Sequence, residues 1–129
     1  MLNINDFIIE KLKINSKSKI NQYKYHPKDK KELNEIISKL TKERGLDADL
    51  NDIDTSKINN MEYLFMNRPM LHADVSEWDV SNVTNMESMF FGSKIDCDLS
   101  KWDVRNVTNM KDMFKYSALE KNPPKWYHE

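Results

Sequence analysis

The sequence predicts an α/β fold, a short solenoid of about three coils of 24 or 25 residues with an N-terminal helical cap. The first supporting observation is internal repetition, because residues 74–90 and 98–114 agree at 12 of 17 positions. The second is that each copy joins a β-branched stretch to apolar residues at helical spacing. With 129 residues, 39% of them hydrophobic, the chain suits one such domain.

Residues 1–45 form the predicted capping segment, in which no repeat column continues. We expect a helix from about residue 29 to residue 44, since Asp29 is a suitable N-cap and Gly45 a suitable stop. Its apolar stripe consists of Leu33, Ile36, Ile37 and Leu40. Upstream, the apolar residues 7–9 predict a short helix or strand folding back onto the first coil. Because a stack of repeats exposes apolar surface at its ends, this segment is expected to cover the first coil.

The repeats divide the rest, residues 46–129, into units 46–70, 71–94 and 95–118 and a C-terminal cap, 119–129. This period falls within the range of leucine-rich-repeat units, so the coils are predicted to be leucine-rich-repeat-like. Six columns stay apolar and are expected to be buried between coils. They are Leu50/Val75/Leu99, Ile53/Trp78/Trp102, Ile58/Val83/Val107, Met61/Met86/Met110, Leu64/Met89/Met113 and Phe65/Phe90/Phe114.

Within each unit the pattern predicts an extended piece, a turn and about two turns of helix. Asn85 is a good N-cap, and Met86, Met89 and Phe90 at i, i+3 and i+4 share one helical face. Glycine is scarce, so Asp and Asn are expected to make the corners through bonds to their own backbone. The recurring candidates are Asp49/Asp74/Asp98 and Asp54/Asp79/Asp103.

The tryptophan column, Trp78/Trp102/Trp126, allows two interpretations. Indoles that face inward belong to the core, which is the interpretation we favour. Indoles that face outward would form platforms for stacking on sugars or gripping a peptide. The pattern alone does not choose between them.

The segments DVSEWDVSNVTNMESMF and DLSKWDVRNVTNMKDMF resemble the BspA-like leucine-rich-repeat family, the group with DUF285-type repeats. The resemblance covers about residues 46–126. It implies a repeat solenoid that acts as a binding surface, and the family offers no catalytic residues to transfer. The chain departs from the pattern at Ile53, Thr55 and Arg105.

Composition excludes several classes of function. Twenty Lys and Arg balance 21 Asp and Glu, so no overall basic field favours nucleic acid or a membrane. The short apolar run at 7–9 is neither a signal-peptide core nor a membrane span, which predicts a cytoplasmic protein. The lone Cys97 fits a small inward position, and the histidines lack metal-ligand spacing. We therefore expect no cofactor and no metal site.

These observations favour a non-catalytic protein-interaction module, not an enzyme, that binds a protein partner through the solenoid surface. The candidate partner-binding residues vary between units: Met66, Glu77, Ser81, Phe91, Lys101, Arg105 and Lys115. An alternative is a phage or mobile-element protein that inhibits a host defence enzyme or forms part of a virion. An enzyme would need a concave pocket with two or more titratable groups. The partner's identity and the oligomeric state stay open.

Overall fold

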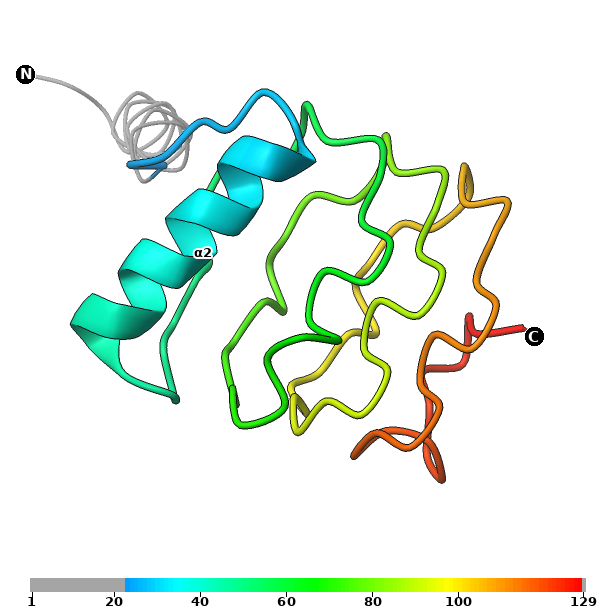
Figure 1. Cartoon of the computed structure of the whole chain (residues 1–129). Helices are drawn as coiled ribbons and strands as arrows, with labels where there is room; N and C mark the ends of the chain where they lie inside the picture. Colours follow the sequence, from blue (N-terminus) through cyan, green and yellow to red (C-terminus); the bar gives the residue numbers. More distant parts are fainter. Residues whose placement is uncertain (1–22, 129) are drawn as a thin grey trace, which may run out of the picture.

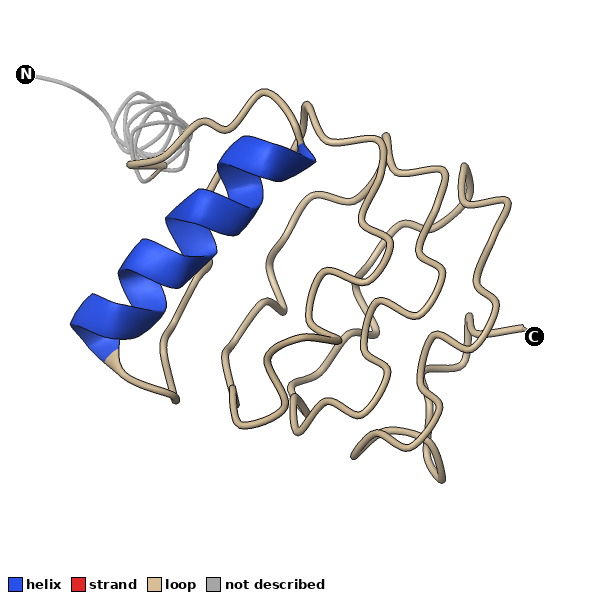
Figure 2. Ribbon diagram, in the orientation of Figure 1, coloured by secondary structure: helices blue, strands red, loops and turns tan. Residues whose placement is uncertain are grey.

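A computed structural model describes residues 23–128, in which helix α2 (Lys30–Arg44) lies beside a stack of irregular turns. Figure 1 shows the stack running from green through yellow to orange, with the red C-terminal segment against its far end. Outside α2 the described chain forms loops and turns (Figure 2). The helix or strand predicted near residues 7–9 lies outside the described residues.

Helix α2 occupies the span that the sequence predicts. The Asp29 side chain accepts a hydrogen bond from the Glu32 N–H at 2.9 Å, and the Glu32 carboxylate accepts one from the Lys28 N–H. At the other end, Gly45 has a φ of 90° and donates its N–H to the Thr41 carbonyl. The helix buries Leu33, Ile37 and Leu40 in the core. Its face toward the stack is thus the predicted apolar stripe.

Successive repeat units lie on one another in register. Parallel bridges join Asn60 to Asn85 and Asn85 to Asn109. The rings of Phe65, Phe90 and Phe114 form a ladder in which neighbouring ring centroids are 5.4 Å apart. All three are buried, so the phenylalanine column is the centre of the core.

The tryptophan column lies in the core beside this ladder. Trp78 and Trp102 are buried, and Trp126 stacks on Trp102 at the end of the column. Each indole N–H donates to a main-chain carbonyl of the preceding unit: Trp78 to Leu50, Trp102 to Val75 and Trp126 to Leu99. Because a buried indole N–H needs a partner, these bonds explain how the column can face inward.

The predicted α/β class, with its leucine-rich-repeat-like solenoid coils, is wrong. The described residues contain only isolated bridges in place of strands, and α2 lies outside the repeats. The expected helix in each unit is absent because its third residue is left-handed: φ is 58° at Tyr63, 53° at Ser88 and 55° at Asp112. A left-handed residue cannot continue a right-handed helix. In the first two units, the N–H groups of this segment instead donate hydrogen bonds to carbonyls of the next unit.

Charged side chains anchor α2 to the first unit. Arg44 donates two hydrogen bonds of 2.8 Å to the Asp52 carboxylate and one of 2.7 Å to the Asp49 carbonyl. In the opposite direction, Arg68 donates to the Asn34 carbonyl of the helix at 3.0 Å. The bond from Arg44 lowers the pKa of Asp52 below its usual value. Polar contacts at the C-terminal end of α2 and in its N-terminal half therefore add to the packing of its apolar face.

Candidate protein-binding surface

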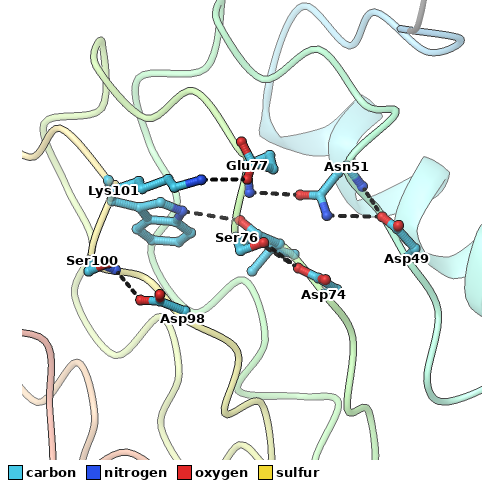
Figure 3. A network of polar contacts seen from close by, with 10 residues as sticks. Asp49, Asn51, Asp74, Ser76, Glu77, Asp98, Ser100 and Lys101 are labelled. Atoms are coloured by element: carbon cyan, nitrogen blue, oxygen red, sulfur yellow. Dashed lines mark hydrogen bonds and ion pairs between the residues drawn. The ribbon is translucent and has the colours of Figure 1, made fainter.

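One exposed charge pair, Glu77 with Lys101, lies beside the first Asp corners of the second and third units (Figure 3). The Asp49 carboxylate accepts from both the backbone N–H and the side-chain amide of Asn51, and the side-chain oxygen of Asn51 accepts from the Glu77 N–H at 2.9 Å. Lys101 reaches the Glu77 carboxylate at 3.3 Å. The network fixes the backbone under an exposed ion pair, while the charged ends stay in water.

The Asp corners beneath this charge pair are built as the sequence predicts. The Asp74 carboxylate accepts from the Ser76 N–H at 2.9 Å, and the Asp98 carboxylate accepts from the Ser100 N–H at 2.9 Å. These backbone bonds lower the pKa of both carboxyl groups. Each corner is thus a short hydrogen-bonded turn whose carboxylate stays ionised at neutral pH.

A second column of candidate residues follows the next Asp corner. Ser81 bonds to the Asp79 carboxylate through both its N–H and its hydroxyl. In the following unit Arg105 takes the place of Ser81, and its guanidinium lies 3.0 Å from the Asp103 carboxylate. The Arg105 side chain is 78% exposed. The two units therefore have the same type of turn, but the exposed side chain on it is a neutral serine in one unit and a positively charged arginine in the next.

A third group of candidate residues lies after the phenylalanine ladder. Phe91 is half-buried and meets Tyr116 edge to face, with ring centroids 5.3 Å apart. The Lys115 ammonium lies 5.4 Å from the centre of the same Tyr116 ring. Met66 is exposed. Tyr116 therefore joins Phe91 and Lys115 into one aromatic and basic patch.

The structure brings some of the candidate residues together and leaves others apart. Glu77 pairs with Lys101, and Asn106, beside Arg105, donates its amide to the Ser81 carbonyl at 2.7 Å. Across the described range 23–128, no hydrogen bond, ion pair or ring contact connects Met66 to another candidate residue. The surface consequently comprises separate columns and not one continuous site.

One exposed polar group was missed by the sequence interpretation. His72 lies between two carboxylates, with Nδ1 3.2 Å from Asp47 and Nε2 2.5 Å from Asp96. The bond to Asp96, assisted by Asp47, raises the pKa of His72 above its usual value. The three residues occupy the same position in consecutive units, which is the signal that could have found them. Only the protonated ring donates through both nitrogens at once.

A shallow pocket of about 380 Å³ lies between the C-terminal half of α2 and the first unit. Its lining consists of Ser38, Thr41, Lys42, Leu46, Arg68, Pro69, Met70 and Leu71. Leu46 and Met70 are exposed there. The apolar lining carries no pair of carboxylates or other acid and base combination that would point to catalysis.

Other reactive groups are dispersed. Cys97 is half-buried, and desolvation raises the pKa of its thiol, which disfavours the reactive thiolate. Within residues 23–128 no three His, Cys, Asp or Glu side chains gather in a way that could hold a metal ion. Over the same range, no helix has the length and apolar character needed to cross a membrane.

The repeats and α2 together match a known family. Residues 31–129 match the family described as "Mycoplasma protein of unknown function, DUF285". The matched range includes α2 as well as the repeats. No curated protein and no solved structure matches the chain.

Proposed function

The chain belongs to the DUF285 family, and from this premise we propose that it is a non-catalytic module that binds a protein partner through the surface of its stacked units. The supporting observation is the column at Glu77 and Lys101. The two side chains are exposed, and hydrogen bonds between neighbouring units fix the backbone that carries them. Rigid support lowers the entropy lost when such side chains bind a partner.

Charge distribution supports a protein as the partner. Residues 49–98 contain three Lys or Arg and ten Asp or Glu, whereas residues 99–129 contain six and four. Exposed charges of this kind steer association and select partners more than they add affinity. Arg105 and Lys101 lie where the acidic part of the surface gives way to the basic part. A partner with the opposite pattern of charge would bind in one register.

Charge reversal tests the proposal. The triple variant Glu77→Lys, Lys101→Glu, Arg105→Glu keeps an opposite pair at 77 and 101 and should therefore fold normally. Tagged wild-type protein is used to capture its partner from extracts of the source cells, and the captured protein is identified by mass spectrometry. We expect the triple variant to lose at least about tenfold in affinity for that partner.

The control is Lys94→Glu, which changes an exposed charge outside the candidate columns. It should leave capture unchanged. Equal capture by wild type and the triple variant would refute the role of these columns. Chemical conversion of the captured partner by the pure protein would refute the non-catalytic assignment.

A further inference from the structure

A ladder of parallel hydrogen bonds joins each unit to the next. In the first unit the N–H groups of Met61, Tyr63 and Phe65 donate to three carbonyls of the second unit. The acceptors are Asn85, Glu87 and Met89, all at 2.9 Å. The second unit repeats the pattern toward the third, with Met86, Ser88 and Phe90 donating to Asn109, Lys111 and Met113. Every bond of this ladder therefore runs from an N–H to a carbonyl one unit further along.

Within residues 23–128 the ladder ends with three donors that have no acceptor in a following unit. In the third unit the equivalent N–H groups belong to Met110, Asp112 and Phe114, and across residues 23–128 none of them has an acceptor. The next donor along, the Tyr116 N–H, bonds to the Glu120 carboxylate at 2.9 Å. We call the N–H groups of residues 110, 112 and 114 the open edge. The donor that follows them along the chain, the Tyr116 N–H, already binds a carboxylate.

Apolar surface accompanies the open edge. Val80, Val83 and Met86 of the second unit are at most 1% exposed, whereas their equivalents in the third unit are only half-buried. These equivalents are Val104, Val107 and Met110. The C-terminal segment covers the aromatic side, since Trp126 stacks on Trp102 and Tyr127 meets Phe114. One half of the last unit therefore lacks the cover that the earlier units have.

A pocket of about 240 Å³ adjoins the open edge and is lined by Asp112, Phe114, Lys115, Glu120 and Tyr127. Basic residues predominate in this part of the chain, with six Lys or Arg against four Asp or Glu from residue 99 onward. Lys111 is exposed within the open-edge segment. Donor groups, a pocket and positive charge together favour an occupant that supplies oxygen acceptors and negative charge.

We infer that the open edge binds an acidic segment of a partner protein, which adds to the stack as a fourth layer. The carbonyls of this segment accept from Met110, Asp112 and Phe114, and its apolar side chains cover Val107 and Met110. The principle is that of strand addition to an unpaired sheet edge, in which the main chain supplies affinity and the side chains supply specificity. The inference deepens the proposed function and rests on it.

The earlier units show what such a segment looks like. Residues 85–89 already make these contacts with the first unit, and Glu87 occupies the position equivalent to Lys111. A fourth layer with an acidic residue at that position would place it beside Lys111. A second copy of the chain does not fit head to tail, because α2 lies against the first unit, where Lys30 contacts Glu62 and Tyr63.

The test uses a synthetic peptide with the sequence of residues 83–92, VTNMESMFFG, and the full chain labelled with ¹⁵N. In the free protein we expect the amides of Met110, Asp112 and Phe114 to exchange at least about tenfold faster than those of Met86, Ser88 and Phe90. Added peptide should shift these three signals and slow their exchange. Equal protection without peptide, or shifts confined to another surface, would overturn the inference.

A charge exchange tests the acidic preference. A control peptide carries Lys in place of Glu87 and should bind wild-type protein about three- to tenfold more weakly. The variant Lys111→Glu should reverse that preference, while Lys94→Glu should leave both affinities unchanged. Equal binding of the two peptides to all three proteins would contradict an acidic occupant.

Further outcomes separate the open-edge inference from pairing with a second copy and from the proposed function. Signals of the open edge that shift with protein concentration in the absence of peptide would show pairing with a second copy and overturn the choice of occupant. If the peptide fails to bind but reversal at Glu77, Lys101 and Arg105 abolishes partner capture, the inference fails and the proposed function stands. If the peptide binds and that reversal has no effect, the candidate columns fail and the open edge stands.

Discussion

Replacing Phe90 by alanine should cost far more stability than the same replacement at its neighbour Phe91. Phe90 is fully buried, and its ring stacks on Phe65 and Phe114 at 5.4 Å on either side and meets Trp102 at 5.8 Å. Truncating a core phenylalanine costs about 3–5 kcal/mol. Because the ring lies between two others and leaves a cavity when removed, we expect about 4 kcal/mol at Phe90, the middle of that range.

Phe91 provides a matched control because the same atoms are removed one residue away. It is half-buried and has a single edge contact with the exposed Tyr116. Such a pair is worth about 0.5–1.5 kcal/mol, so Phe91→Ala should cost about 1 kcal/mol. The difference between the variants is then about 3 kcal/mol, which corresponds to more than a hundredfold change in the unfolding equilibrium.

Urea unfolding followed by tryptophan fluorescence measures both variants, because Phe90 contacts the buried Trp102. The free energies come from linear extrapolation, with circular dichroism as an independent probe of two-state behaviour. Equal losses for the two variants, or a loss below about 1.5 kcal/mol for Phe90→Ala, would refute the stacked ladder as the centre of the core.

Three further substitutions test the turns and the polar contacts. Gly92→Ala should cost about 1 kcal/mol in urea unfolding, because φ is 68° although the added Cβ meets nothing within 4 Å; a neutral variant would contradict a left-handed turn. The pKa of His72 is raised, so its stabilising contribution is complete below about pH 6.5 and is lost as pH rises through the folded-state pKa. His72→Asn should therefore differ from wild type at pH 5.5 and match it at pH 9, and a gap in urea midpoint that widens with pH would show the opposite sign. Arg44→Lys cannot keep both bonds to Asp52, so amides of α2 should exchange faster while that of Phe90 is unchanged; equally fast exchange at both places would mean global destabilisation.

The repeat period was sufficient to predict most of the residues that share the core, although Val107 and Met110, also expected to be buried, are only half-buried. Positions 24 or 25 residues apart meet when units lie in register, so the burial of Phe65, Phe90 and Phe114 follows from the sequence. The same register brings Glu77 and Lys101 together as an ion pair. The bond between Arg44 and Asp52 joins the helix to the first unit, and no periodic pattern relates those two residues.

Local structure inside the unit was not predictable in the same way. Apolar residues at i, i+3 and i+4, such as Met86, Met89 and Phe90, fit a helix, but they also fit a tight turn that buries the same three side chains. The choice depends on Ser88, which is left-handed although serine has no intrinsic preference for that conformation. Hydrogen bonds to the next unit, formed only in the folded stack, offset the cost of that conformation.

The left-handed residue also explains why the segment 110–114 of the last unit presents donors along its open edge. With Ser88 in that conformation, the N–H groups of residues 86, 88 and 90 face the third unit and the carbonyls of residues 85, 87 and 89 face the first. A regular strand would alternate donors and acceptors along each edge. Within this segment the donors of successive units point one way, so the ladder that it forms has a donor end and an acceptor end. Helix α2 packs against the acceptor end, while the donor end remains open at Met110, Asp112 and Phe114. The feature that excludes a helix in each unit thus gives the stack its direction and leaves one end able to receive another chain.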